Sequence, residues 1–292
     1  MNIKMIVTDM DGTLLNNRDE CSAATCAALI KAQEKGMRLV LASGRSYTKM
    51  LKYADMLHMR EFGGYLIEVN GMALMDLKTS KRTVYQQLNQ QDCQRLFDAL
   101  APYVVEQIYM IDDGMYHYLP QPIYEKKVAY RKQHGYPDDY PLTASILGYL
   151  YDNREGYPRL MTMQTPKDIK LPINKLCVYE EPNKLKPIAD DIKATFQQDY
   201  WAGLVHNNWL EITQLGVSKA VRLKQLADQL HIKSDEILCF GDGENDIEML
   251  QSVTYGIAMG NALDNVKQAA FDVTLSNDED GIWAALKQYE II

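Results

Sequence analysis

The chain is organised around Ile3-Lys-Met-Ile-Val-Thr-Asp-Met-Asp-Gly-Thr-Leu-Leu15. Residues 3–8 are mostly apolar and end in β-branched residues, which predicts a short buried strand. Two acidic residues, Asp9 and Asp11, follow it directly. Carboxylates at the end of a buried strand are costly unless a metal ion or a cation compensates them, and ligands of open α/β sheets bind at the carboxyl ends of strands. The stretch therefore indicates a ligand site at this sheet edge.

Two other interpretations of the Asp-x-Asp tripeptide need to be considered. Asp and Gly are common turn formers, so the tripeptide on its own could simply open a turn. A calcium-binding EF-hand loop is excluded, because it requires Gly at its sixth position and Glu at its twelfth, and it follows a helix. Counted from Asp9, the sixth position holds Leu14 instead of Gly, although the twelfth does hold Glu20, and a predicted strand rather than a helix precedes the stretch.

Composition limits the class of protein. The chain has 292 residues, of which 47% are hydrophobic and 24% charged, as in a soluble globular protein of one large or two ordinary domains. Its net charge is −8 and it has no dense basic run, so we do not expect a nucleic-acid partner. No window approaches the roughly 18 apolar residues of a membrane helix, so we expect a cytoplasmic protein without a membrane partner. We also expect either a monomer or a small homo-oligomer.

The cysteines and histidines argue against a zinc site. Five cysteines are widely spread without a Cys-x-x-Cys pair, and five histidines contain no His-x-x-x-His pair. We expect the cysteines to be reduced and structural.

The first third of the chain alternates between strand and helix patterns. Residues 23–35 predict a helix that Ser22 precedes and Gly36 terminates, and residues 37–42 predict a second strand. A helix over 47–57 and a strand over 65–69 follow. Asn70-Gly71 then predicts a hairpin turn into a returning strand over 72–76. This order predicts the beginning of a parallel sheet.

The pattern is interrupted once and then resumes. From about Val84 the chain changes character, with a region rich in Tyr, Pro and Asp over 135–158 and further strands and helices. The strand and helix alternation returns in the last third of the chain. The predicted fold is α/β, with a Rossmann-like, mostly parallel sheet core formed by residues 1–83 and 209–292 and an inserted α/β cap domain over 84–208.

Two further positions lie where this sheet would bring them close to Asp9. Ser43 and Gly44 follow the second strand, and a hydroxyl with backbone N–H groups at a helix start suits an anionic oxygen, although Ser43 could be an ordinary helix cap. Lys219 begins a predicted helix, where the helix dipole disfavours a cation. Its position therefore suggests a role other than helix stability, the alternative being an exposed surface lysine.

The fourth position is Gly241-Asp242-Gly243-Glu244-Asn245-Asp246, directly after the apolar strand over 237–240. A dinucleotide site is disfavoured, because Asp246 replaces the third glycine of that motif and the acidic residues would repel a pyrophosphate. A second acidic strand end instead favours a divalent cation. Oxygen ligands without Cys or His favour a hard ion such as Mg²⁺.

Together these motifs resemble the haloacid dehalogenase superfamily, specifically its Cof-type sugar-phosphatase branch with the larger α/β (type C2) cap. The resemblance covers nearly all of both core segments, and the inserted segment lies where that branch places its cap. Its motifs are Asp9-Met10-Asp11-Gly12-Thr13-Leu14, Ala42-Ser43-Gly44-Arg45, Asn70-Gly71, Gly216-Val217-Ser218-Lys219, Gly241-Asp242-Gly243-Glu244-Asn245-Asp246, Ala258-Met259-Gly260-Asn261-Ala262 and Asp280-Gly281.

The resemblance implies a Mg²⁺-dependent phosphatase of small phosphorylated metabolites, sugar phosphates above all. Asp9 is implied as the nucleophile that becomes an aspartyl phosphate, and Asp11 as the general acid and base. The other implied roles are phosphate binding by Met10, Gly12, Ser43, Gly44, Lys219 and Asn245, metal binding by Asp9, Asp11 and Asp242, and support by Arg45, Asn70 and Asp246.

Two alternative functions remain open on the sequence. Phosphomannomutases resemble this architecture, but a mutase must also hold a second phosphate. The candidate cations for that site form no recognisable cluster: Arg131, Lys132, Arg154 and Arg159. A catalytically idle binding protein is disfavoured, because none of the implied chemical positions is substituted. The sequence does not indicate the physiological substrate or the cap residues that select it.

Overall fold

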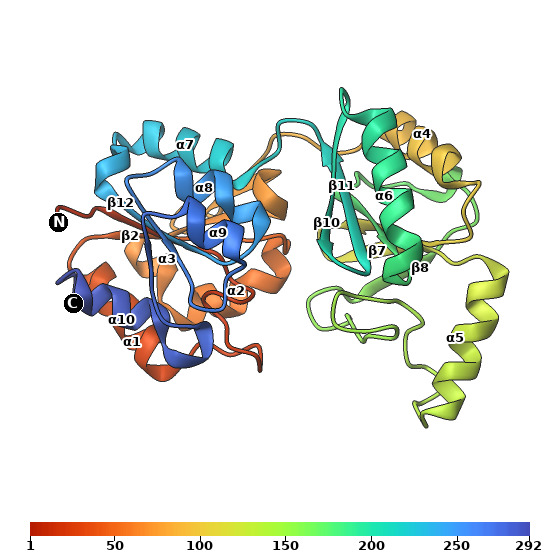
Figure 1. Cartoon of the computed structure of the whole chain (residues 1–292), viewed down its shortest axis with the longest axis horizontal. Coiled ribbons are helices and arrows are strands. Elements are labelled where there is room, and N and C mark those ends of the chain that lie inside the picture. The colour runs from red at the N-terminus through yellow and green to blue at the C-terminus, as the bar shows by residue number, and fades with distance from the viewer. The chain divides into compact units, whose positions relative to one another are not determined.

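The computed structural model describes the whole chain, residues 1–292, which forms two compact units (Figure 1). The core unit comprises Met1–Tyr85 and Val217–Ile292, and the inserted unit comprises Gln86–Gly216. The inserted unit thus ends after Gly216 rather than after residue 208. The reason is that strand β11 (Trp209–Gln214) pairs with two strands of the inserted unit and not with the core sheet.

The core unit contains an eight-stranded, mostly parallel sheet with the order β14-β13-β12-β1-β2-β3-β4-β5. Only the pairs β3/β4 and β4/β5 are antiparallel. This sheet confirms the predicted α/β class with a parallel core. Its strands are β1 (Met5–Thr8), β2 (Arg38–Ala42), β3 (Tyr65–Glu68), β4 (Ala73–Asp76), β5 (Lys81–Val84), β12 (Ile237–Gly241), β13 (Tyr255–Ala258) and β14 (Asp272–Val273).

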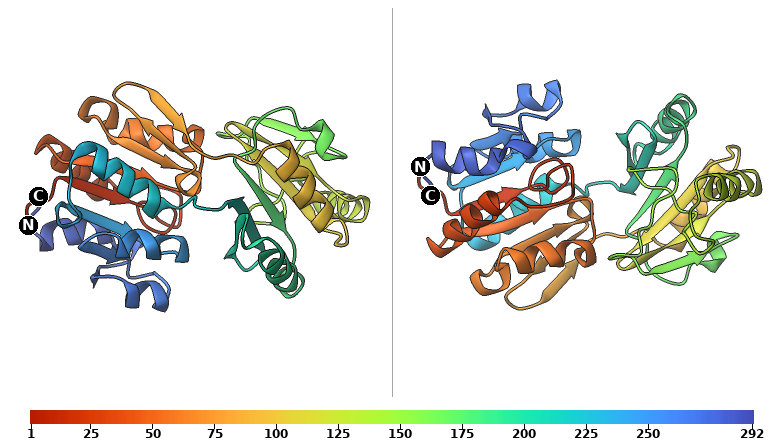
Figure 2. Two further views of the ribbon diagram at one scale, coloured as in Figure 1. Left: turned by 90° about the horizontal axis from the view of Figure 1, so that it is seen from above. Right: turned by 90° about the horizontal axis from the view of Figure 1, so that it is seen from below.

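Helices cover both faces of the core sheet, and Figure 2 shows the two layers. Because successive side chains of a strand point to opposite faces, Ile6 of β1 joins one hydrophobic cluster while Met5 and Val7 join the other. The first cluster includes residues of α1, α2 and α10, and the second includes residues of α7, α8 and α9. The helices are α1 (Ala23–Glu34), α2 (Tyr47–Met56), α3 (Met59–Phe62), α7 (Lys219–Leu230), α8 (Ile247–Gln251), α9 (Asp264–Ala269) and α10 (Gly281–Gln288), with short 3₁₀ turns η1 (Val69–Gly71), η3 (Ser234–Glu236), η4 (Glu244–Asp246) and η5 (Asn277–Glu279).

The inserted unit contains a separate six-stranded sheet with the order β10-β11-β9-β6-β7-β8, antiparallel except for β7/β8. One face packs against α4 and α6 in a single apolar cluster. Its elements are α4 (Gln90–Leu100), β6 (Glu106–Ile111), β7 (Gly114–Tyr118), α5 (Gln121–Gln133), β8 (Arg159–Thr162), η2 (Pro166–Asp168), β9 (Lys175–Tyr179), α6 (Pro182–Phe196), β10 (Tyr200–His206) and β11. None of the helices in either unit has the length and apolar character needed to cross a membrane.

The cysteines only partly meet the expectation. Cys93, Cys177 and Cys239 are free and buried, whereas Cys21 and Cys26 form a disulfide. The expectation that all five are reduced is therefore corrected. The turn into α1 brings this pair together, with their Cα atoms 6.3 Å apart.

The loop between β3 and β4 holds the start of α7 in place. Residues 69–72 form this loop, in place of the predicted two-residue turn, and it contains the 3₁₀ turn η1. Gly71 has a φ of +102°, and a Cβ atom on it would lie 2.2 Å from the carbonyl oxygen of Ser218. Only glycine allows this approach, so Gly71 lets the loop pack directly on the residue that precedes Lys219.

We expect Gly71→Ala to destabilise the protein more than Gly36→Ala. Both positions have a positive φ, which costs an alanine about 1–2 kcal/mol, but nothing lies within 4 Å of a Cβ atom at Gly36. At Gly71 the overlap with Ser218 adds about 1–3 kcal/mol. Urea unfolding of the two variants measures the difference, and equal losses would show that the close approach is unimportant.

Candidate active site

Two acidic strand ends lie side by side in the core sheet. β1 and β12 are parallel neighbours with Thr8 opposite Phe240, and the backbone N–H of Asp9 donates to the carbonyl of Phe240 at 3.0 Å. Asp9 follows β1 and Asp242 follows β12, so their carboxylates emerge at the same edge. Asp9 is only 6% exposed. The two sequence motifs therefore meet at the carboxyl ends of adjacent strands.

Lys219 projects into this acidic edge from the first turn of α7. Its Nζ lies 2.5 Å from Oδ1 of Asp9 and 2.8 Å from Oδ1 of Asp246, and its side chain is 1% exposed. Ser218 caps α7 by accepting the backbone N–H of Val221 at 3.2 Å. These ion pairs explain a lysine in a helix position that the helix dipole disfavours.

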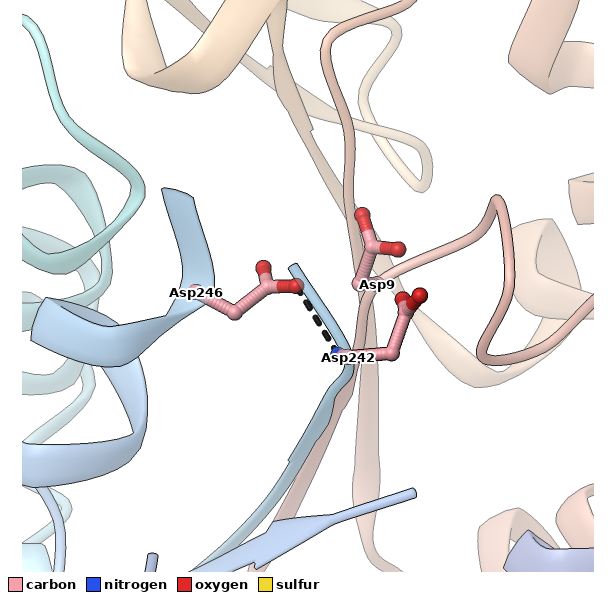
Figure 3. A group of neighbouring side chains, drawn as sticks. All are labelled: Asp9, Asp242 and Asp246. Carbon is pink, nitrogen blue, oxygen red and sulfur yellow. Dashed lines mark hydrogen bonds between the residues drawn. The ribbon is translucent and has the colours of Figure 1, made fainter. Parts of the chain in front are cut away.

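Asp246 is held by the backbone of the loop that carries it. Its Oδ2 accepts the backbone N–H groups of Asp242 at 3.1 Å and of Gly243 at 3.0 Å, while Oδ1 accepts from Lys219. Figure 3 shows the first of these bonds and the side chains of Asp9, Asp242 and Asp246 gathered at the sheet edge. Asp246 therefore fixes both the loop after β12 and the lysine.

The electrostatic balance at this edge is negative. Burial is the largest influence on Asp9 and raises the pKa of its carboxyl well above the usual range, Lys219 acts in the opposite direction, and Asp246 and Asp242 raise it further. Burial also raises the pKa of Asp242 to about 6, against a hydrogen bond of 2.8 Å from the Thr13 hydroxyl. Burial would lower the pKa of Lys219, but the charges of Asp246 and Asp9 outweigh it and raise the pKa. One lysine therefore does not neutralise three carboxylates.

The residues present fit a hard divalent cation. Asp9, Asp242 and Asp246 each offer a carboxylate oxygen, and these oxygens lie within 4.8 Å of one another. The donors are all oxygen, the type that Mg²⁺ binds, and the excess negative charge favours a dication. Gly12, at a φ of +79°, leaves the space open, because a Cβ atom there would lie 2.3 Å from Oδ2 of Asp242.

Asp11 lies outside this group of carboxylates, although it belongs to the predicted metal-binding set. Its side chain is half exposed and forms a two-bond ion pair with Arg45, in which Nε donates to Oδ2 at 3.0 Å and Nη2 donates to Oδ1. Arg45 also pairs with Asp19, with 2.5 Å between Nη2 and Oδ1. Asp246, for which the resemblance implied a supporting role, lies in the acidic group instead, and a contribution of Asp11 to metal binding stays a prediction.

Ser43 lies fully buried at the end of β2, next to the predicted phosphate loop. Its Oγ accepts the backbone N–H of Arg45 at 3.1 Å, and its carbonyl accepts the N–H of Asn70 at 2.9 Å. Gly44 lies between Ser43 and Arg45. The side chain of Asn245 donates to Oδ1 of Asn70 at 3.2 Å. The loops after β2, β3 and β12 are thus joined by hydrogen bonds.

Two of the predicted phosphate-binding residues can contribute only through their backbone. The Met10 side chain is fully buried in the first hydrophobic cluster, and Gly12 has no side chain. Asn261 donates to the carbonyl of Gly12 at 2.8 Å and so steadies this turn.

Sequence reasoning missed three residues that organise the site: Thr13, Asn261 and Asp19. Thr13 and Asn261 lie inside the quoted motifs but were given no role. No pattern singled out Asp19, which meets Arg45 only through the fold.

Three of the four cations considered for a second phosphate site lie close to acidic residues of the inserted unit. Arg154 pairs with Asp152, and Arg159 pairs with Asp113. Arg131 lies 4.0 Å from Asp138. These contacts are typical of surface charge and give the mutase alternative no support.

Comparison with known proteins points to one family over nearly the whole chain. A family model described as haloacid dehalogenase-like hydrolase matches residues 6–286. A solved structure of a haloacid dehalogenase-like hydrolase from Bacteroides thetaiotaomicron is 27% identical, with a TM-score of 0.79, and the match covers 98% of this chain and 99% of that one.

Two curated relatives from Bacillus subtilis carry phosphatase names. The 5-amino-6-(5-phospho-D-ribitylamino)uracil phosphatase YitU is 26% identical over 98% of this chain and 97% of its own length. Phosphatase YwpJ is 26% identical over 98% of this chain and 99% of its own length.

We expect Asp242→Asn to raise the melting temperature in metal-free buffer by about 2–4 °C, which corresponds to ~1 kcal/mol in a domain of this size. The substitution removes one of three crowded negative charges and keeps an acceptor for Thr13. Mg²⁺ should then stabilise the natural protein by binding its folded state, and stabilise the variant less.

Glu244→Gln provides the matched control, because it removes a charge from the same loop but outside the group of three carboxylates. Glu244 accepts only from Asn265, at 3.0 Å. Thermal melts with and without Mg²⁺ make the comparison. If Mg²⁺ stabilised all three proteins equally, Asp242 would not hold the ion.

Proposed function

Since this chain belongs to the haloacid dehalogenase-like hydrolases and is a phosphoric monoester hydrolase, we propose that it hydrolyses small phosphorylated metabolites, sugar phosphates above all, through an aspartyl phosphate on Asp9 and with Mg²⁺. The observation that carries the proposal is the buried contact of 2.5 Å between Lys219 Nζ and Asp9 Oδ1. An ammonium group at this place can stabilise negative charge on both the carboxylate and an incoming phosphoryl group.

Asp9 is the proposed nucleophile. One carboxylate oxygen attacks phosphorus, the bond from phosphorus to the substrate oxygen breaks, and Asp9 carries the phosphoryl group. Its position directly after core strand β1, with its backbone N–H bonded to β12, keeps it aligned. Splitting one difficult displacement into two easier ones is the advantage of a covalent intermediate.

Asp11 is the proposed general acid and base. It gives a proton to the departing substrate oxygen and then takes a proton from the water that attacks the aspartyl phosphate, which releases inorganic phosphate and restores Asp9. The half-exposed position of Asp11, beside the buried carboxylates rather than among them, supports this role, because a proton carrier has to reach both substrate and water.

The remaining residues position charge. Ser43, Lys219, Asn245 and the backbone around Met10, Gly12 and Gly44 are proposed to bind the phosphoryl oxygens, with support from Asn70 and Asp246. Asp9 and Asp242, with Asp246 nearby, would hold the dication, which when bound neutralises phosphoryl charge. Positioning and charge neutralisation dominate phosphoryl transfer, so these residues supply most of the rate.

The proposed substrate class is inferred from relatives of this chain rather than from a substrate-binding site in the structure. YitU is named for a phosphate ester on a ribityl group, which supports a phosphorylated small molecule as substrate of this chain. Selection among such substrates is assigned to the inserted unit as part of the same proposal. Phosphate release from a panel of phosphorylated metabolites, with Mg²⁺ present, tests this assignment.

We expect Asp9→Asn to reduce phosphate release at least 10³-fold, roughly the loss seen when a nucleophile is removed. The fold should persist, because Lys219 keeps its contact with Asp246. Asp235→Asn makes the same chemical change at an exposed position in η3 and should be fully active. Substantial turnover by a folded Asp9→Asn protein would refute the nucleophile assignment.

We expect Asp11→Asn to affect substrates according to their leaving groups. A sugar phosphate needs its leaving oxygen protonated, so its turnover should fall by about 10²-fold or more, whereas p-nitrophenyl phosphate, whose leaving group is stable as an anion, should lose far less. Steady-state kinetics with both substrates measure the two losses. Equal losses would contradict the acid role.

A further inference from the structure

The loop over residues 69–72 has a backbone conformation that its sequence does not favour. Three consecutive residues have a positive φ: Val69 at +44°, Asn70 at +54° and Gly71 at +102°. Glycine and asparagine tolerate this left-handed region, whereas a β-branched residue such as valine rarely adopts it. Val69 is also only 2% exposed, so this is not a loose surface turn. Contacts with the surrounding structure therefore have to hold the loop in place.

The loop contacts residues that are proposed to bind the phosphoryl group. The backbone N–H of Asn70 donates to the carbonyl of Ser43 at 2.9 Å, and the N–H of Val69 donates to the carbonyl of Arg45 at 3.0 Å. The side chain of Asn70 accepts a hydrogen bond from Asn245 at 3.2 Å. A shift of the loop would therefore move both Ser43 and Asn245.

A buried arginine of α7 binds the same loop. Arg222 is 2% exposed, and its Nε donates to the carbonyl of Gly71 at 2.8 Å. The other contacts of its side chain are with Gln225 and with the ring of Tyr85, so no carboxylate pairs with it. A guanidinium at this depth is costly without a partner of opposite charge. The mechanism described above gives Arg222 no role that would explain its burial.

Tyr85 completes the contact between Arg222 and the loop. Its ring stacks on the guanidinium, with 3.2 Å between Cζ of Arg222 and the ring centroid. Its backbone N–H donates to the carbonyl of Met72 at 3.0 Å. An aromatic ring suits the planar guanidinium and restricts its orientation. Tyr85 therefore binds the end of the loop with its backbone and the arginine with its ring.

The helix that carries Arg222 also carries Lys219. The two residues are three positions apart on α7, a spacing that makes side chains neighbours on a helix. Lys219 contacts Asp9 and Asp246, while Arg222 contacts Gly71. The first turn of α7 is thus tied both to the acidic strand ends and to the loop.

We propose that Arg222 is a positioning residue for phosphoryl transfer. Stacked on Tyr85, it holds the loop over 69–72 in its left-handed conformation. The loop in turn sets the position of Ser43 relative to Lys219. This inference rests on the phosphoryl-binding roles proposed for Ser43 and Lys219.

Arg222→Met tests the inference, because it keeps a long apolar side chain and removes both the donor to Gly71 and the stacked guanidinium. We expect kcat/KM to fall by about tenfold, less than the ~10²-fold that a 1 Å misplacement can cost. The loss should be equal for a sugar phosphate and p-nitrophenyl phosphate, because both present the same phosphoryl group. The inhibition constant of orthovanadate, a mimic of the five-coordinate transition state, should rise by the same factor.

The vanadate constant separates positioning from a loss of folded protein. Fewer folded molecules lower the apparent kcat but leave the inhibition constant of the remaining enzyme unchanged. Thermal melts of every variant, with assays well below each melting temperature, report the folding directly.

Three further variants provide the comparison. Tyr85→Leu removes the stacked ring and should show a smaller loss of the same kind, whereas Tyr85→Phe keeps the ring and should stay close to the natural protein. Lys224→Met is the matched control, since it removes a cation at an exposed position of the same helix.

A fall in kcat/KM of folded Arg222→Met with a matching rise of the vanadate constant supports the positioning role. If folded Arg222→Met behaves like Lys224→Met, or loses kcat with an unchanged vanadate constant, the positioning role alone is overturned, provided that the natural protein is active and Asp9→Asn is not. If Arg222→Met does not fold, Tyr85→Leu decides by the same two measurements. A natural protein that releases no phosphate from either substrate or from the metabolite panel overturns the proposed function and this inference with it.

Discussion

The ammonium group of Lys219 between Asp9 and Asp246 is the contact on which the rest of the site depends. It lies at hydrogen-bond distance from both carboxylates and is almost fully buried. Carboxylates crowded in a buried place repel one another and lose hydration, so they require a cation close by. Lys219 provides one positive charge, and the remaining negative charge is what makes the place suitable for a dication and a phosphoryl group.

Several backbone features hold Lys219 and its two carboxylate partners together. Parallel pairing of β1 and β12 sets Asp9 and Asp242 side by side, and two backbone amides of the loop after β12 hold Asp246. Gly71 also holds the start of α7 in place, because its lack of a side chain lets the loop pack directly against Ser218. A rigid frame of this kind matters for phosphoryl transfer, because small displacements of charged groups weaken transition-state stabilisation strongly.

Burying these carboxylates lowers the stability of the folded protein. Burial raises the pKa of both Asp9 and Asp242, which means that the folded protein holds charges it would hold more easily in water. The environment of Asp11 is different, because its side chain is half exposed and its carboxylate pairs with Arg45. Acidic residues of similar intrinsic chemistry thus have different environments, and the difference supports the proposed roles of Asp9 as nucleophile and Asp11 as proton carrier.

The sequence by itself determined the α/β class, the parallel core and the membership of Asp9, Asp242 and Lys219 in one site. Strand and helix periods, turn residues and strand-end positions are local signals, and the carboxyl ends of neighbouring parallel strands must lie at one edge. The same local signals located the insertion but not its second boundary, because only strand pairing shows that β11 belongs to the inserted sheet.

Only the tertiary structure decided which side chains lie together and which partners they contact. It put Asp246 rather than Asp11 among the clustered carboxylates, and it brought Asp19 to Arg45 across 26 residues of sequence. The direction in which a side chain points at the end of a strand, and the partner it finds there, depend on packing between distant segments. No period or motif in the sequence encodes that packing.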